Sequence, residues 1–579
     1  MTTDISTSET ETSDAQDSGN PMARRYMLIA TVVFIVGLIL AALAAFQLAF
    51  PDVASGSQYT TYGRLVPAGR ILLINGWLPL AGIGLTYFAI TQITREPLKA
   101  RLSATVALVL ITLGAVASAG AVIAGLSTGI PGQEGPVWAR AISAIGFLFA
   151  TFAVTASAKQ KRDRLGPAGW YLTAAGWWLA VSALFGLIPL MNGTAGAIQA
   201  AFAAIGLYQL FAVSTAIGLL YFAFTKISGA EFTRARPLAA LGFWSVALTW
   251  AFMGGSQLIY SATPDWYETL TIAFAIGALV PTMAIATDLG LLLKGQVQSI
   301  GDRATLRYGV ISGLALATAT VAKLLLVWRA TSVVVQYTTW TAGIDALLVL
   351  GGASFAIFAA NSVRRGGGAT GTTFHFSWSV IGLTGMVASL LTGGIVTGFS
   401  WIAGPSSQIF DNYGPGYEVA VASLAPFLLM SAIFFAIYVV AQVVYLVRIG
   451  ATSEGDLAVP DAQVSYDLEF EGTTRYVTWK RLAWGASLVW IAAAVFTAVL
   501  PMLDNADTAT TITADRFRTY EPGSQQLAGR NLYISEGCTE CHTQSVRPIV
   551  TDVGLGAVSI AGDYANEDPA LLTGTRIGP

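Results

Sequence analysis

The sequence predicts an all-α polytopic membrane protein, and three observations lead to this fold class. Hydrophobic residues make up 54% of the 579 residues, charged residues only 11%, and the mean hydropathy is +0.63. A soluble chain of this length needs far more charge to cover its surface. In addition, apolar stretches of about 20 residues, enough to cross the hydrocarbon core of a bilayer as a helix, recur along most of the chain.

The predicted elements form five regions. Residues 1–25 are rich in Ser, Thr and acidic residues, which predicts a disordered cytoplasmic tail and no cleavable signal peptide. Residues 26–447 hold twelve apolar stretches, and the polar, acidic residues 448–481 predict a cytoplasmic linker. Residues 482–502 predict a separate anchor helix, and residues 503–579 follow it, so a fusion of two ancestral units is the economical interpretation. The predicted spans are 26–49, 71–93, 103–126, 138–157, 168–191, 198–225, 237–260, 268–293, 307–329, 339–360, 375–401, 417–447 and 482–502.

Basic residues alternate between successive loops. The odd-numbered loops 192–197, 261–267 and 402–416 contain no Lys or Arg, whereas the first loop is an exception with Arg64 and Arg70. By the positive-inside rule, the N-terminus is cytoplasmic, and an odd number of spans then places the C-terminal segment outside the cell. The basic residues before the first span and in the even-numbered loops are Arg24, Arg25, Arg95, Lys99, Arg101, Lys159, Lys161, Arg162, Arg164, Lys226, Arg234, Arg236, Lys294, Arg303, Arg364, Arg365, Arg448, Arg475, Lys480 and Arg481.

The counts of a few residue types exclude several function classes. The net charge is −2, so no basic surplus remains to neutralise the phosphates of a nucleic-acid partner. The two cysteines, Cys538 and Cys541, are too few and too close for a disulfide framework. The two histidines, His375 and His542, limit the metal centres that the chain itself can hold.

One motif carries specific chemistry. Cys538-Thr539-Glu540-Cys541-His542 has the C-x-x-C-H spacing of covalent haem c attachment. Each of the two thiols can form a bond to a porphyrin vinyl group, and the adjacent histidine is then the proximal ligand of the iron. The alternatives are a chance match and a redox dithiol, and the dithiol is disfavoured because no βαβ redox domain surrounds the motif. We therefore predict one covalently bound haem c held by Cys538, Cys541 and His542, with His542 as the iron ligand.

The sixth ligand of this haem is not evident from the sequence. High-potential c-type sites usually use methionine, but the last of the nine methionines, Met502, precedes the motif. The chain ends 37 residues (579 − 542) after His542, too soon for a usual cytochrome fold to close. Three explanations stay open: the sequence is truncated, which we favour, another chain completes the site, or the iron is five-coordinate.

A family resemblance starts from four stretches of the C-terminal segment: 528–538 (AGRNLYISEGC), 541–548 (CHTQSVRP), 561–564 (AGDY) and 575–579 (TRIGP). They resemble the membrane-anchored monohaem subunit of the cbb3-type cytochrome c oxidases, a branch of the haem–copper oxidases. The resemblance covers about 483–579. In that family the last stretch continues into the rest of the cytochrome domain, which implies truncation at the end of this chain.

The body is similar to the twelve-span subunit of the same family. The similarity lies in residues 61–67 (TYGRLVP), 260–266 (YSATPDW) and 337–343 (YTTWTAG). It implies a haem–copper oxidase subunit I-like bundle, followed by one anchor helix and a partial c-type cytochrome domain. In the family, this subunit uses six histidines to hold two b-type haems and a copper ion.

Those metal ligands are missing from this chain. None of the residues in their place can substitute for a neutral imidazole on haem iron or copper. His375 matches a family histidine that does not resemble a metal ligand, so we expect a satisfied core or interfacial histidine. We therefore expect neither haem b nor copper in the body. The family's ligands fall at Gly69, Ser256, Gln257, Ile344 and Ala346, and the remaining copper ligand falls near Ile205.

Three ionisable residues, Asp288, Lys323 and Asp345, lie within predicted spans. Such residues are costly in a bilayer and are usually paired or functional. Lys323 and Asp345 could form an ion pair or be the remnant of a proton route. Alternatively, each residue lies near a span end and reaches the interface.

The favoured function is a membrane-bound c-type cytochrome that transfers electrons as a non-catalytic subunit of a cbb3-type oxidase-like respiratory complex. The implied location is a bacterial cell membrane. The implied partners are the lipid bilayer, a soluble or membrane cytochrome c donor, and a catalytic haem–copper oxidase subunit in another chain, with the body as docking platform. The histidine count rejects a terminal oxidase or nitric oxide reductase for this chain alone. A haem-based redox or ligand sensor, or a structural membrane subunit, remains the alternative.

Overall fold

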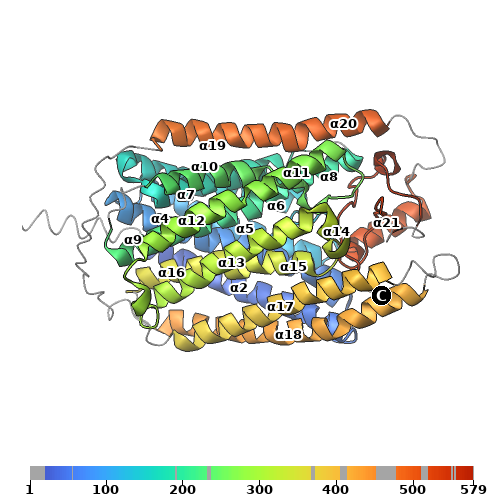
Figure 1. The fold of residues 1–579 in the computed structure, drawn as a ribbon, viewed down its shortest axis with the longest axis horizontal. Helices are drawn as coiled ribbons and strands as arrows, with labels where there is room; N and C mark the ends of the chain where they lie inside the picture. Colours follow the sequence, from blue (N-terminus) through green and yellow to red (C-terminus); the bar gives the residue numbers. More distant parts are fainter. Residues whose placement is uncertain are drawn as a thin grey trace, which may run out of the picture.

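The computed structural model confirms an all-helical membrane protein. Its helices lie roughly along the long axis of the molecule, with the C-terminal segment at one end (Figure 1). Eleven helical segments of the described residues are long and apolar enough to cross a bilayer. The structure describes residues 20–577 except 55, 189–191, 231–235, 367–371, 404–413, 452–476, 510–519, 550–551 and 553–555.

The helices of the body follow the predicted spans. Two of these helices are not among the eleven segments that are long and apolar enough to cross a bilayer. Helix α7 is rich in tryptophan and glycine, and α10 is apolar but short. The helices are α2 (Asn20–Ala49), α3 (Tyr62–Ile71), α4 (Leu78–Thr94), α5 (Arg101–Ile123), α6 (Val137–Ala158), α7 (Gly166–Phe185), α8 (Gly193–Ala204), α9 (Phe211–Ser228), α10 (Pro237–Ala251), α11 (Asp265–Gly277), α12 (Leu279–Leu292), α13 (Ala304–Val327), α14 (Arg329–Val335), α15 (Trp340–Asp345), α16 (Ser354–Arg364), α17 (Thr373–Ala403) and α18 (Gly414–Ala451).

Two boundaries differ from the sequence-based expectation. Helix α2 begins at Asn20, inside the region predicted as a disordered tail, and buries Met22 and Ala23. Helix α10 ends at Ala251, before the predicted limit of 260, and the 3-10 helix η5 (Gly254–Gln257) follows it. Its two glycines favour the change because glycine weakens a continuing α-helix. Residues 1–19 of the predicted tail and 452–476 of the predicted linker lie outside the described residues.

Three long helices of the body contain a π-helical stretch. These stretches are η2 (Leu72–Trp77), η4 (Ile205–Leu210) and η7 (Ala346–Ala353). A π-helix is rare and is frequently found at functional sites, since it widens a helix and redirects the side chains around it.

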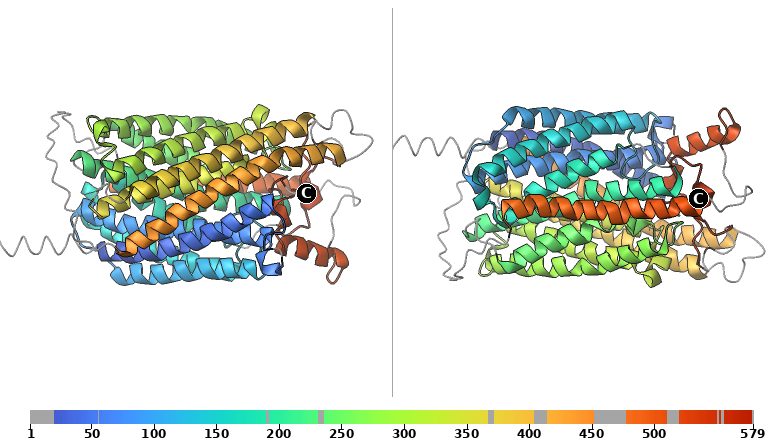
Figure 2. Two further views of the ribbon diagram at one scale, coloured as in Figure 1. Left: turned by 90° about the horizontal axis from the view of Figure 1, so that it is seen from below. Right: turned by 90° about the horizontal axis from the view of Figure 1, so that it is seen from above.

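The predicted anchor is a helical segment packed along the outside of the body. It comprises α19 (Trp479–Ala494), the π-helix η9 (Val495–Val499) and α20 (Leu500–Ala509), and it lies over α7 and α10 (Figure 2). The indole Nε1 of Trp178 donates to Ala486 O at 3.4 Å, and Nε1 of Trp490 donates to Ser182 Oγ at 3.1 Å. The anchor is thus held by tryptophan hydrogen bonds as well as by apolar contact.

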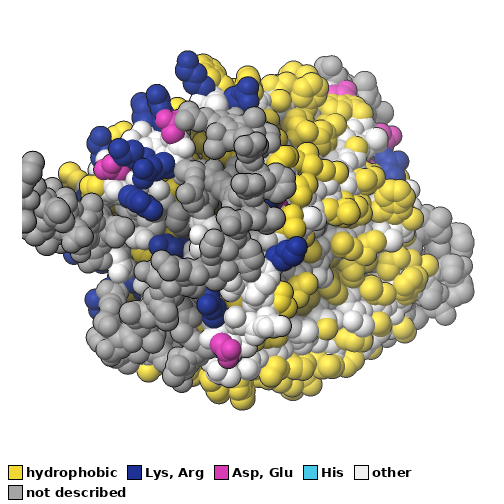
Figure 3. Space-filling view, turned by 60° about the vertical axis from the view of Figure 1, so that its left-hand side comes forward, with side chains coloured by type: hydrophobic (Ala, Val, Ile, Leu, Met, Phe, Trp, Pro, Cys, Tyr) yellow, Lys and Arg dark blue, Asp and Glu magenta, His cyan; other side chains and the backbone are white. Residues whose placement is uncertain are grey.

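Basic side chains gather at the end of the bundle that is opposite the C-terminal segment. Figure 3 shows Lys and Arg on this end, beside a broad hydrophobic flank. Arg95 ends α4 and Arg101 starts α5 there, and Lys161 pairs with Glu96 at 3.3 Å. The charge alternation along the sequence therefore corresponds to two chemically different ends of the molecule.

The ionisable residues within the spans have partners that the sequence does not reveal. Asp288, with 2% of its side chain exposed, pairs with Arg236 and accepts from Tyr221 Oη at 3.0 Å. Lys323 donates to Gln209 Oε1, and no salt bridge joins it to Asp345, both of which the structure describes. The direct Lys323–Asp345 ion pair, one of the possibilities that the sequence leaves open, is therefore not formed.

His375 is buried between Tyr308 and Gln442. Its Nδ1 lies 2.6 Å from Tyr308 Oη, and its Nε2 lies 3.0 Å from Gln442 Oε1. Both ring nitrogens thus have a hydrogen-bond partner, and the side chain is 1% exposed. The expectation of a satisfied core histidine is confirmed.

Candidate haem site

The C-x-x-C-H motif forms one tight turn after helix α21 (Gln525–Ser535). Gly537 adopts the left-handed conformation with φ +65°, and the 3-10 helix η11 (Cys538–Glu540) follows. The backbone N–H groups of Cys541 and His542 both donate to Cys538 O, at 3.2 and 2.9 Å. The turn therefore holds both thiols and the imidazole close together, and the His542 side chain is exposed. This arrangement fits covalent attachment of a haem with an axial histidine.

The turn lies in backbone contact with helix α3 of the body. A Cβ atom added to Gly63 would lie 1.9 Å from Glu536 O, and one added to Gly537 would lie 2.0 Å from Gly63 O. Real Cβ atoms do not approach other atoms this closely, so both positions require glycine. The backbones of these two chain segments, 474 residues apart (537 − 63), are thus in direct contact, which a side chain at either glycine would prevent.

Replacing Gly63 by alanine is expected to weaken this contact. The new methyl group meets backbone rather than a flexible side chain. We therefore expect the free energy of unfolding to fall by about 1–3 kcal/mol or more, as for an overpacked core. Thermal unfolding of the purified protein, followed at the haem absorbance, would measure it. Gly529→Ala in α21 is the control, because a Cβ there meets nothing within 4 Å. Equal stability of both variants would show that the fit at Gly63 is unimportant.

Arg64 of α3 binds Glu536, which lies two positions before Cys538. Its guanidinium donates to Glu536 through Nη2 at 2.5 Å and through Nε at 3.1 Å, and its Nη1 donates to Ile123 O at 2.9 Å. The Arg64 side chain is 8% exposed. A bidentate, largely buried Arg–carboxylate pair fixes orientation as well as distance.

Arg70, also in α3, binds a carboxylate inside the motif. It donates to both carboxylate oxygens of Glu540, and its Nε donates to Glu134 Oε1 at 2.6 Å. Glu134 is 2% exposed, accepts from the Gly132 N–H at 2.9 Å, and has an Oε2 with no hydrogen-bond partner among the described residues. Burial raises the pKa of Glu134, the Arg70 guanidinium only partly offsets this, and the neighbouring Glu540 carboxylate raises the pKa further. We call Arg70, Glu134 and Glu540 the arginine clamp.

A second ion cluster joins the C-terminal residues to one another. Asp552, with a fully buried side chain, accepts from Arg547 Nη2 at 3.0 Å and from Arg576 Nη2 at 2.7 Å. Both guanidinium groups lie over the ring of Tyr337 in the body, at 5.2 and 5.1 Å from its centroid. The Arg576 N–H also donates to Tyr337 O at 2.7 Å, so the C-terminal residues rest directly on the body.

Acid is expected to weaken this second cluster. Burial alone would raise the pKa of Asp552, but Arg576 and Arg547 hold it well below its ordinary value of about 3.9. The carboxylate therefore stabilises the folded protein fully above that ordinary value, and the contribution is lost as pH falls further. We expect Asp552→Asn to cost about 3–5 kcal/mol at neutral pH. It should also flatten the fall in Tm between about pH 5 and 3.

Calorimetry of the variant and of the parent protein across this pH range would check the expectation. Asp302→Asn, at an exposed carboxylate of the opposite end, is the matched control. A parent and an Asp552→Asn protein with the same acid dependence would contradict it.

The two cysteines are poor redox nucleophiles in this environment. Burial and the nearby Glu540 raise the pKa of Cys541 to about 12, and burial and Glu536 raise the pKa of Cys538. A redox-active dithiol needs a lowered pKa instead. The environment therefore disfavours the dithiol alternative.

Two family profiles match this chain. The profile described as "Cytochrome C and Quinol oxidase polypeptide I" matches residues 21–437, and the one described as "Cytochrome C oxidase, mono-heme subunit/FixO" matches residues 480–579. The chain belongs to the haem–copper oxidase subunit I family. It carries a monohaem cytochrome c segment at its C-terminal end. Both parts of the resemblance seen in the sequence are thereby confirmed.

Curated relatives are more distant. The chain is 22% identical over 344 residues to a "Cytochrome c oxidase subunit 1 homolog" of Agrobacterium tumefaciens (strain T37), covering 55% of this chain and 61% of the relative. It is 22% identical over 236 residues to a bacteroid "Cytochrome c oxidase subunit 1 homolog" of Bradyrhizobium diazoefficiens, covering 39% and 42%. The chain therefore spans less than two thirds of the length of these relatives.

The fold is similar to that of a solved oxidase. A haem–copper terminal oxidase dimer determined by cryo-EM gives a TM-score of 0.64 at 13% identity, covering 90% of this chain and 98% of that chain. At this identity the similarity concerns the arrangement of the helices alone. It confirms the predicted subunit I-like bundle.

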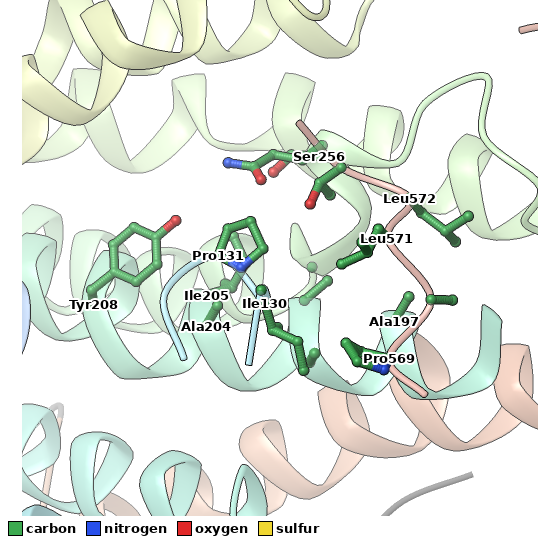
Figure 4. Close-up of a pocket in the computed structure, with 17 residues that line it drawn as sticks. Ile130, Pro131, Ala197, Ala204, Ile205, Tyr208, Ser256, Pro569, Leu571 and Leu572 are labelled. Carbon is green, nitrogen blue, oxygen red and sulfur yellow. The ribbon is translucent and has the colours of Figure 1, made fainter. Parts of the chain in front are cut away.

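The positions where the resemblance places the family's copper ligands meet at one place. Ile205, Ser256 and Gln257 line a small cavity of about 40 Å³, and Tyr208 lies in the same wall (Figure 4). Ile205 begins the π-helix η4. A hydroxyl, an amide and a hydrocarbon side chain do not make a copper site.

One of the positions where the resemblance places the family's haem ligands lines a larger cavity. Ala346, the first residue of η7, lines it, as does Arg70, the neighbour of Gly69. Neither Gly69 nor Ala346 offers a donor atom in its side chain, and the described residues contain no group of three or more His, Cys, Asp or Glu that could hold a metal ion. The residues present therefore do not fit a histidine-ligated haem b or a copper ion.

Several residues of the site escaped the sequence-based reasoning. Arg64 and Arg70 stood out only as exceptions to the charge alternation, and the structure explains them as partners of Glu536 and Glu540. Glu134 gave no signal at all. The partners lie about 470 positions away in the chain, so no local pattern could pair them.

Proposed function

We propose that this protein is a membrane-bound c-type cytochrome. Cys538 and Cys541 attach one haem c covalently and His542 binds its iron, while the body holds neither haem b nor copper. The protein passes electrons as a subunit of a cbb3-type oxidase-like respiratory complex. The observation that carries this proposal is the haem-attachment turn seated on a body in which no histidine stands at the positions of the family's metal ligands.

The chain's own residues have distinct parts in this function. A bound haem c would supply one-electron redox chemistry at the exposed side of the turn. Arg64 and the arginine clamp hold the turn at a fixed place on the body, so that a partner protein meets it in one orientation. The body provides a rigid membrane support for the turn.

The orientation and the partners belong to the same proposal. The basic end of the bundle faces the cytoplasm, and the cytochrome segment lies outside the cell membrane. A cytochrome c of the soluble or membrane type donates electrons, and a catalytic haem–copper subunit in another chain accepts them. The exposed His542 side supports access by such a partner.

A pyridine haemochrome spectrum combined with acid–acetone extraction tests the proposal. We expect one non-extractable haem c per chain and no extractable haem b. Stoichiometric haem b would mean that other residues bind it, and the idea of a ligand-free body would be abandoned. Tight binding of carbon monoxide to the reduced protein would instead favour the ligand-sensor alternative, because it requires an open coordination position.

A further inference from the structure

Basic side chains form one dense surface at the end of the bundle that is opposite the haem-attachment turn. They come from the start of α2, from the stretch between α4 and α5, and from the 3-10 helix η3 (Lys159–Arg164), and all of them are exposed. The same segments contain only two carboxylates, Glu96 and Asp163, so their net charge is +7 (9 − 2). We call these nine residues the basic surface: Arg24, Arg25, Arg95, Lys99, Arg101, Lys159, Lys161, Arg162 and Arg164.

Hydrogen bonds hold the three segments side by side. Gln160 Nε2 of η3 donates to Pro97 O at 2.9 Å, which fixes η3 against the stretch between α4 and α5. The hydroxyl of Tyr26, near the start of α2, donates to Ala104 O in the first turn of α5 at 2.6 Å. The basic residues of the three segments are therefore neighbours in space as well as in composition.

Most cations of the basic surface have no counter-charge in the protein. Lys161 pairs with Glu96 at 3.3 Å. In contrast, Arg95, Arg101 and Arg162 form no ion pair and no side-chain hydrogen bond with another described residue. Like charges held at short distances repel one another, and their summed field attracts anions. An anion that binds here is thus stabilised by several cations at once.

The basic surface lies at the level of lipid head groups. Leu102, directly after Arg101, is 78% exposed, and Phe152 of α6, seven residues before Lys159, is 61% exposed. Exposed apolar side chains on membrane-spanning helices face the hydrocarbon of the bilayer. Seven helical residues rise by about 10 Å, close to the roughly 5–8 Å of the head-group layer on each side of the hydrocarbon. Figure 3 shows the same transition, with Lys and Arg beside the hydrophobic flank.

This position discriminates between classes of anion. A soluble acidic protein or a nucleic acid binds away from the bilayer, whereas these cations adjoin lipid-facing side chains. Six of the nine residues are arginines, whose planar guanidinium binds two phosphate oxygens at once. We propose that the basic surface binds the phosphate groups of anionic phospholipids. This goes beyond the proposed function, because neither the haem nor electron transfer takes part in it.

The test titrates the full-length protein, stripped of lipid in a neutral detergent, with phosphatidylglycerol or with phosphatidylcholine of the same acyl chains. Native mass spectrometry gives the dissociation constants of the first bound lipids. We expect phosphatidylglycerol to bind about fivefold more tightly, the effect of about one cation close to a lipid phosphate. Raising ammonium acetate to about 1 M should remove this preference, because the Debye length falls to about 3 Å.

Two matched variants separate the basic surface from the basic end as a whole. Arg162→Gln/Arg164→Gln should lose most of the preference for phosphatidylglycerol. Lys294→Gln/Arg303→Gln removes the same charge from the loop between α12 and α13, outside the basic surface, and should keep it. Circular dichroism verifies that the helices of both variants are unchanged.

Three outcomes would overturn the proposal. Equal affinity of the parent protein for the two lipids would exclude a phosphate site. Equal loss in both variants would mean that the preference belongs to the whole basic end. Residues 1–19 carry five carboxylates and no Lys or Arg, so tighter binding of phosphatidylglycerol after their removal would assign the basic surface to this segment instead.

Discussion

The double variant Cys538→Ala/Cys541→Ala is expected to contain no covalently bound haem at all. No other cysteine exists in the chain, so no thiol remains to form a bond to the porphyrin. The membrane body should still insert and fold, because Cys541 contacts it only at one end, beside Leu424 and Leu428 of α18, and alanine keeps the Cβ there. Haem staining after denaturing electrophoresis would check the loss, and circular dichroism would check the helices.

His375→Ala is the matched control for this prediction. It removes the other histidine of the chain, which is bound by Tyr308 and Gln442 far from the turn in sequence. We expect it to lower stability and to leave the covalent haem in place. Haem that survives the double cysteine variant but disappears with His375 would place the prosthetic group in the body instead.

The fold was predictable because membrane spans are encoded locally. An apolar run of sufficient length satisfies the bilayer and its own backbone as a helix, whatever the rest of the chain does. Each of the thirteen predicted spans overlaps at least one helix of the described residues. The early end of α10 was missed because the residues after Ala251 remain apolar while the glycines at 254 and 255 change the backbone.

The attachment residues were predictable for a different reason. Covalent haem binding needs two thiols and an imidazole at a fixed short spacing, so Cys538, Cys541 and His542 carry their own signature. The contacts that hold the turn on the body have no such signature in the sequence, because the tertiary fold alone brings Arg70 to Glu540. The same limit applies to Lys323, because its hydrogen-bond partner Gln209 lies 114 positions away and no local pattern connects the two.

Arg70→Gln is expected to have the second-largest effect. It leaves Glu134 and Glu540 without their shared cation, and Glu134 is almost fully buried. Breaking a buried pair by removing one partner typically costs about 3–5 kcal/mol. We therefore expect the turn to detach from α3, seen as a lowered Tm of the haem-monitored transition and as faster proteolysis of the C-terminal segment.

A second readout separates the charge of Arg70 from its packing. Loss of a cation next to the turn disfavours the added electron, so the midpoint potential of the haem should fall in Arg70→Gln and recover in Arg70→Lys. Arg101→Gln, at an exposed arginine of the opposite end, should change neither Tm nor potential. An unchanged potential in Arg70→Gln would show that the clamp has only a structural role.

The triple variant Arg70→Gln/Glu134→Gln/Glu540→Gln tests whether unpaired charge causes the loss of stability in Arg70→Gln. It removes all three charges together, so no carboxylate is left buried and unpaired, and neutral side chains of nearly the same shape remain. We expect it to be clearly more stable than Arg70→Gln alone, since the three residues share one network and their effects are not additive. A triple variant less stable than the single one would mean that α3 holds the turn through hydrogen-bond geometry rather than through charge.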